Sequence, residues 1–165
     1  MPDFLAAGLG ANRKNAYHPF DWSGLFAQAR EPDDPWTIPE AFFCILFTAI
    51  ACDGNVAHLE QEELLALAHR SRALKALTLT ELGDVNASVV ARMAARPNSA
   101  LQEACAALPA EMTANVFAHA LDLALSDGAL APSEATFLND LIDALGLDAE
   151  TVASIANVMV LKNQY

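Results

Sequence analysis

Four acidic residues occupy matching places in two copies of a short motif, and they are the residues best suited to chemistry. The first copy reads DGNVAHLE and holds Asp53 and Glu60, and the second reads DGALAPSE and holds Asp127 and Glu134. Carboxylate oxygens are the ligands that hard divalent cations prefer. The sequence therefore predicts a site for a divalent metal ion, with Ca²⁺ as one candidate, at these carboxylates: Asp53, Glu60, Asp127 and Glu134.

The same motif also has a purely structural interpretation. Each Asp follows an expected helix and can accept backbone N–H groups at the start of the next one. Each Glu lies near the third residue of the next expected helix, where it can complete a capping box. Gly54 and Gly128 suit left-handed helix ends. An EF-hand is excluded, because that loop has Gly sixth and Glu twelfth, whereas here they are second and eighth. The residues alone leave both interpretations open.

Two helical hairpins would position these motifs. Residues 41–52 carry no charge and predict a helix that is apolar on all sides and is enclosed by other helices. Thr37 and Glu40 have the spacing of a capping box at its start. A second helix is expected from about Ala57 to Ser71. Because residues 115–142 repeat this pattern, we expect helical-hairpin units related by pseudo-twofold symmetry.

Other helices follow from capping residues and apolar periodicity. Thr80 is expected to cap a helix with these residues inward: Leu82, Val85, Val89 and Met93. A short helix should run from Ser99 to Ala107, and Asp148 should cap the last one after a stop at Gly146. We therefore predict an all-α domain over residues 37–165 with about eight helices, in repeat units of about 37–95 and 109–163.

Residues 1–36 form an arm outside this pattern. Half of the aromatic residues lie in it, and a disordered tail is normally poor in aromatics: Phe4, Tyr17, Phe20, Trp22, Phe26 and Trp36. We expect a short helix from Trp22 to Arg30 that packs on the body or on a second subunit. We also expect Trp22, Phe26 and Trp36 to be largely buried. The alternative is a partly mobile leader.

Composition restricts the class of protein. The chain has 165 residues, is 54% hydrophobic and carries a net charge of −12. Nucleic-acid binding is disfavoured, because phosphate contacts need Lys and Arg. No secretory signal or membrane-length apolar run is visible, so we expect a cytoplasmic protein without a membrane span. Cys44, Cys52 and Cys105 are expected to be reduced, buried apolar residues.

No pattern of catalytic residues stands out, and we do not expect an enzyme. A polar stripe at helical spacing comprises Glu111, Asn115, His119, Asp122 and Ser126. His119 and Asp122 have the spacing of metal ligands or an acid–base pair, but such a stripe usually faces solvent. The chain lacks a nucleophile elbow and a Gly-rich phosphate loop.

The paired motifs resemble the tellurite-resistance TerB family and its relatives, which include the amino-terminal domain of membrane-bound J-domain co-chaperones. The resemblance covers about residues 37–160, and rests on DGNVAHLE and DGALAPSE after Ala-rich helices. It implies a duplicated all-α fold, a cation site at the motif carboxylates, a role in tellurite or chemical-stress resistance, and membrane-associated protein partners. The competing hypothesis is a non-enzymatic helical module that binds a protein partner or a second copy, with the acidic motifs acting only as helix caps.

Overall fold

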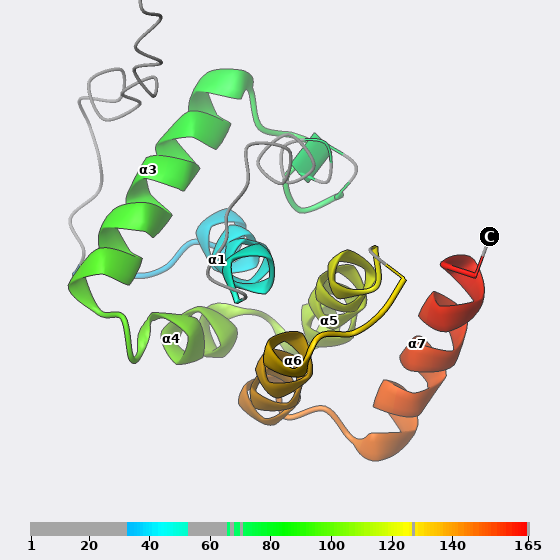
Figure 1. The fold of residues 1–165 in the computed structure, drawn as a ribbon. Coiled ribbons are helices and arrows are strands. Elements are labelled where there is room, and N and C mark those ends of the chain that lie inside the picture. Colours follow the sequence, from blue (N-terminus) through cyan, green and yellow to red (C-terminus); the bar gives the residue numbers. More distant parts are fainter. Residues whose placement is uncertain (1–32, 53–65, 67, 70, 127, 165) are drawn as a thin grey trace, which may run out of the picture.

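The fold consists of packed α-helices (Figure 1). The computed structural model describes residues 33–52, 66, 68–69, 71–126 and 128–164. Within these ranges there are six helices and no strand: α1 Ile38–Ala51, α3 Leu79–Ala95, α4 Ala100–Ala107, α5 Ala110–Ala124, α6 Pro132–Leu145 and α7 Ala149–Lys162. The predicted all-α class is confirmed. The predicted eight helices and pseudo-twofold symmetry are not confirmed. Most of the helix expected over residues 57–71 lies outside the described residues, and so does the helix expected from Trp22 to Arg30.

The helix ends follow local capping chemistry. Thr37 and Glu40 form the predicted capping box at the start of α1, and the Asp148 side chain caps α7 through the Thr151 backbone N–H. Gly146 ends α6 with a left-handed φ of 64°, a conformation that glycine adopts without steric cost. These ends agree with the sequence predictions.

One predicted cap is wrong by two residues. The cap of α3 is Thr78 rather than Thr80. The Thr78 N–H donates to the Glu81 carboxylate at 2.7 Å, and the Glu81 N–H donates back to the Thr78 hydroxyl at 3.3 Å. This pairing needs a carboxylate three residues after the cap, and Thr80 has Gly83 at that place.

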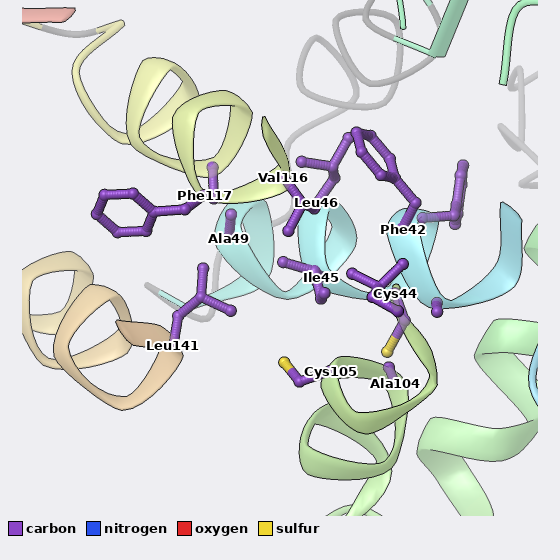
Figure 2. Packing of buried hydrophobic residues seen from close by; sticks show 14 of the residues in the cluster. Phe42, Cys44, Ile45, Leu46, Ala49, Ala104, Cys105, Val116, Phe117 and Leu141 are labelled. Carbon is purple, nitrogen blue, oxygen red and sulfur yellow. The ribbon is translucent and has the colours of Figure 1, made fainter. Parts of the chain in front are cut away.

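Helix α1 is the centre of the core (Figure 2). It packs against α3, α4 and α5, and residues 40–46 are all buried. Phe42 and Ile45 are fully buried, and Phe43 is 1% exposed. Burying one such side chain contributes about 1.5–3 kcal/mol. The enclosed helix predicted over residues 41–52 is therefore confirmed for its first turns.

Two of the three cysteines lie in this core. Cys44 of α1 and Cys105 of α4 are buried, and burial raises the pKa of their thiols to about 12 and about 11. Both are therefore protonated at neutral pH and pack as small apolar residues, as predicted. Cys52 is partly buried, and its thiol donates to the Ala49 carbonyl at 3.0 Å.

Candidate functional site

The second acidic motif forms the connection between α5 and α6. After α5 the Gly128 N–H donates to the Leu125 carbonyl at 3.1 Å, and Gly128 has φ +80°. This positive φ explains why the motif has glycine, since a side chain would strain the turn. Pro132 then begins α6, with its fixed φ suited to a first helical position.

Glu134 turns back towards this connection, as the sequence predicts. Its carboxylate accepts a hydrogen bond from the Ala131 N–H at 2.6 Å. The reciprocal bond of a full capping box cannot form, because alanine has no side-chain acceptor. A carboxylate has two oxygens and several lone pairs, so this bond does not use up the ability of Glu134 to bind a cation. The observed contact is thus compatible with either interpretation of the motif.

The described residues include one of the four carboxylates that the sequence predicts to bind a metal ion. Glu134 is the member of the set within the described residues, whereas Asp53, Glu60 and Asp127 lie outside them. In the part of the chain that the structure describes, no group of three or more His, Cys, Asp or Glu side chains is arranged to hold a metal. The four-carboxylate site stays a prediction.

The polar stripe of α5 is only partly a solvated face. Glu111, Asn115 and Ser126 are exposed, as expected for such a face. In contrast, Asp122 accepts hydrogen bonds from the Lys162 ammonium and, at 3.0 Å, from the Asn163 amide at the end of α7. Burial would raise the pKa of Asp122, but these bonds outweigh it and lower the pKa. Asp122 of α5 therefore links α5 to the end of α7 through these hydrogen bonds.

His119 lies one turn before Asp122 and is partly buried. Its ring meets the ring of Phe42 edge-on, with centroids 5.6 Å apart and planes at 70°. Burial lowers the pKa of His119 below the ordinary value of 6.5, although the nearby Asp122 carboxylate acts in the opposite direction. The imidazole is therefore neutral at neutral pH, and it packs as part of the α1–α5 contact.

This pKa shift predicts a loss of stability in acid. The folded protein binds the His119 proton less readily than the unfolded chain does, so stability falls as the pH drops below about 6.5. One proton contributes a slope of at most about 1.4 kcal/mol per pH unit. Urea unfolding of His119→Gln between pH 7.5 and 5.5 should give a flatter profile than wild type. His69→Gln, at an exposed histidine, is the control. If the unfolding free energy of wild type, His119→Gln and His69→Gln changed equally with pH, His119 would not be the source of the acid sensitivity.

A buried polar cluster links α1 to α3. Glu40, Ser88 and Arg92 are 2%, 2% and 1% exposed. The Ser88 hydroxyl donates to the Glu40 carboxylate at 2.6 Å, and the Arg92 Nε donates to the Ser88 oxygen at 3.4 Å. Burial would raise the pKa of Glu40, but the bonds from Ser88 and Thr37 and the charge of Arg92 together lower it. Glu40 is therefore an ionised buried carboxylate.

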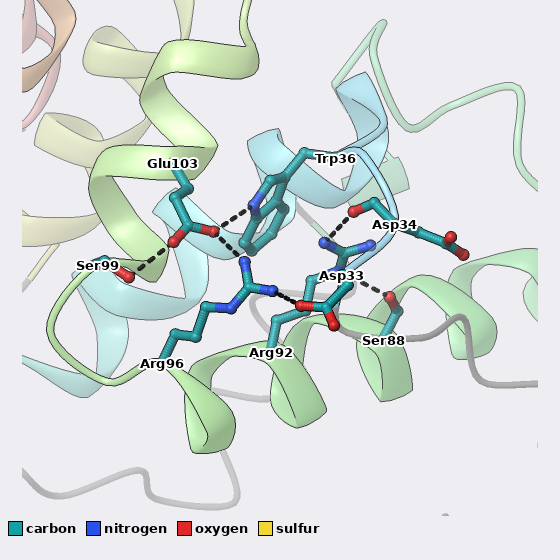
Figure 3. Close-up of polar contacts among 8 residues, drawn as sticks. All are labelled: Asp33, Asp34, Trp36, Ser88, Arg92, Arg96, Ser99 and Glu103. Carbon is teal, nitrogen blue, oxygen red and sulfur yellow. Dashed lines mark hydrogen bonds and ion pairs between the residues drawn. The ribbon is translucent and has the colours of Figure 1, made fainter.

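The same cluster holds the segment that leads into α1, residues 33–37 (Figure 3). Arg92 donates to the Asp34 carbonyl at 2.7 Å and lies 4.8 Å above the Trp36 ring, in cation–π geometry. The Trp36 Nε1 donates to Glu103 of α4 at 3.3 Å. Glu103 also accepts from Arg96 at 2.8 Å, and Arg96 in turn contacts Asp33. Trp36 is partly buried and packs against the core, while Trp22 and Phe26 lie outside the described residues.

Sequence reasoning missed this cluster, although a signal was present. Leu82, Val85 and Val89 mark the inward face of α3, and Arg92 continues their spacing of three and four residues. A charged residue at a core position of a helix needs a buried partner. The contacts of the cluster join α1, α3 and the segment before α1. We therefore treat it as support for the fold rather than as a site of chemistry.

Comparisons with known proteins bear on the family. No helix in the described ranges is long and apolar enough to cross a membrane. No curated protein and no solved structure gives a significant match to the chain. The family described as tellurite resistance protein TerB does match, over residues 40–157. This match spans most of the chain and includes both acidic motifs. The chain therefore belongs to the TerB family.

Proposed function

We propose that this chain is a non-enzymatic, metal-binding protein of TerB type that acts in the response to tellurite or related chemical stress. The observation that carries the proposal is the recurrence of the Asp-Gly…Glu motif within the family match over residues 40–157. The orientation of Glu134 is compatible with it, because the bond that this carboxylate accepts from the Ala131 N–H leaves oxygen lone pairs for a cation. A divalent cation held by both motifs would join the two hairpins.

The negative charge of the four carboxylates explains why the proposed site would bind a cation. Four carboxylates gathered in a chain of net charge −12 repel one another, and a divalent cation relieves that repulsion. Metal binding would therefore stabilise the folded state and create a less acidic surface at the two connections. A change of this kind in surface charge suits recognition by a protein partner. We extend the proposal to a cytoplasmic location, as expected from the sequence, and to a membrane-associated partner, as the family resemblance implies.

Metal addition is expected to raise the melting temperature. An ion present at a hundredfold excess over its dissociation constant stabilises the fold by about 2.7 kcal/mol. Calorimetric titration and thermal melting with chelator, Ca²⁺, Mg²⁺, Mn²⁺ and Zn²⁺ measure this effect. Asp53→Asn and Asp127→Asn should remove most of the gain, whereas Asp140→Asn, at an exposed acid of α6, should keep it. If no ion changes the melting of wild type, the metal proposal fails.

A helical interaction module is the second candidate function. The hydrogen bond that Glu134 accepts from the Ala131 N–H favours it, because a capping role alone accounts for the position of this carboxylate. Here Glu134→Gln should leave melting unchanged with every ion, since a Gln oxygen accepts the same bond. In the metal-binding case the same substitution keeps the cap but reduces the shift caused by metal. This one variant therefore separates the two functions.

A further inference from the structure

Helix α7 is attached to the rest of the protein differently from the other described helices. Each of those five helices has at least three buried residues, whereas α7 has none. Within the described residues, each of them also packs on at least two further helices, while α7 packs chiefly on α5. Figure 1 shows α7 at the edge of the helical assembly, on the far side of α5 from α1. Among the described helices, α7 therefore has the least support from buried packing.

A narrow seam of side chains joins α7 to the core. The partly buried apolar residues of α7 recur every three or four positions and so form one line along the helix: Val152, Ile155, Ala156 and Met159. Asn163 comes four residues after Met159 and continues this line just beyond the helix. Segments with few buried apolar contacts are the ones that open locally in folded proteins. This seam is therefore a place where the fold can open without disturbing α1.

Polar contacts close the C-terminal end of the seam. Asp122 of α5 accepts hydrogen bonds from the Lys162 ammonium and from the Asn163 amide, the second at 3.0 Å. The Asp122 side chain is 21% exposed and that of Lys162 is 56% exposed, so water can compete for this ion pair. Lys162 is also the only Lys or Arg in residues 97–165, which contain nine Asp and Glu. We call Asp122, Lys162 and Asn163 the α7 latch.

The connection between α6 and α7 has the form of a hinge. Gly146 has a left-handed φ of 64°, and a Cβ at this position would lie in open space. The Leu147 N–H donates to the Ile142 carbonyl at 3.2 Å and so closes the end of α6. Asp148 caps the start of α7 through the Thr151 N–H at 2.8 Å. Because each helix end is closed by its own bonds, a change of backbone angles between Leu147 and Asp148 can move α7 and keep both caps.

We propose that α7 opens from α5 as one unit while α1 and α3–α6 stay folded, and that the α7 latch sets how often it opens. Opening breaks the ion pair and uncovers the apolar seam. It also frees the Asp122 carboxylate, which lies one turn after His119 on α5. The open form thus presents a different α5 surface from the closed form, and α7 is a releasable cover for that surface.

Hydrogen–deuterium exchange of the full chain, followed by mass spectrometry in the presence of a chelator, tests this opening. A detached helix of 14 residues is only marginally stable in water, so its amides exchange once it opens. In wild type the amides of α7 should exchange at least about tenfold faster than those of α1, because local opening requires less free energy than global unfolding.

Two latch variants and a matched control test the role of the ion pair. Asp122→Asn and Lys162→Met should each speed exchange in α7 by about fivefold, as expected for loss of a partly solvated ion pair. Asp140→Asn makes the same chemical change at an exposed acid of α6 and should leave α7 as in wild type. The double variant Asp122→Asn with Lys162→Met should exchange no faster than the faster single variant, since both substitutions remove the same contact.

A core variant separates local opening from global unfolding. Phe42 is fully buried in α1, and Phe42→Leu should speed exchange in α1 but not in α7, because the core stays packed when only α7 opens. Equal exchange of α7 and α1 in wild type, or equal acceleration of both by Phe42→Leu, would overturn the proposed opening. If Asp122→Asn speeds α7 no more than Asp140→Asn does, the latch is overturned. Slower exchange in α1 than in α7 shows that each latch variant is folded.

Discussion

Arg92→Ala should lower the free energy of unfolding by about 3–5 kcal/mol, because it removes one partner from a buried charged cluster. Arg92 is 1% exposed and Glu40 is 2% exposed, so the substitution removes a buried positive charge that helps to lower the pKa of a buried carboxylate. The segment before α1 loses two further contacts, the bond to the Asp34 carbonyl and the stacking on Trp36. A loss of this size is a large fraction of the 5–15 kcal/mol typical of a whole domain.

Urea unfolding at neutral pH measures this loss, and Arg96→Ala is the matched control. Arg96 is the residue after α3, and its side chain is 32% exposed. Its ion pairs with Glu103 and Asp33 are partly solvated, so its removal should cost much less stability than the removal of Arg92. Glu40→Gln adds a further check, since in the Arg92→Ala background it should restore part of the lost stability. Equal losses for Arg92→Ala and Arg96→Ala would contradict the buried-cluster interpretation.

Phe42→Ala should cost about 3–5 kcal/mol, the usual range for removing a large aromatic side chain from a core. Phe42 is fully buried, and its ring contacts His119 of α5. Alanine would leave a cavity at the centre of the helical assembly, because α1 is enclosed by α3, α4 and α5 and cannot move to fill it.

Graded substitutions make the prediction for Phe42 specific. Phe42→Leu keeps most of the volume and should cost clearly less than Phe42→Ala. Leu79→Ala, at a side chain 74% exposed, should change the unfolding free energy by no more than about 0.5 kcal/mol. Denaturant unfolding of the three variants gives the order. A loss below about 1 kcal/mol for Phe42→Ala would mean that the aromatic core is not rigidly packed.

The helices of this protein are determined largely by local sequence. The capping box of Thr37 and Glu40, the Asp148 cap and the left-handed Gly146 need only residues within a few positions of one another. Such short-range hydrogen bonds and backbone preferences can be predicted without knowledge of the fold. The same principle explains the error at α3, where the Glu81 spacing selects Thr78 and was present in the sequence.

The sequence predicts less about the candidate metal site than about the helix ends. Repetition of the Asp-Gly…Glu motif identifies the residues, and the family match supports the motif. Whether a carboxylate caps a helix or binds a metal ion depends on which other groups the tertiary structure brings close to it. The structure answers one part of that question, by placing Glu134 on the Ala131 N–H.

By itself the sequence determined the all-α class, most helix ends and the enclosed helix α1, because these depend on local capping and on apolar composition. Only the tertiary structure decided the partners of Glu40 and Asp122. Ser88 is 48 residues from Glu40, and Lys162 is 40 residues from Asp122. No periodicity records such distant pairings, since they arise only when packed helices bring together polar groups that are far apart in the sequence. The Glu40–Ser88 contact is buried, whereas the Asp122–Lys162 contact lies near the surface.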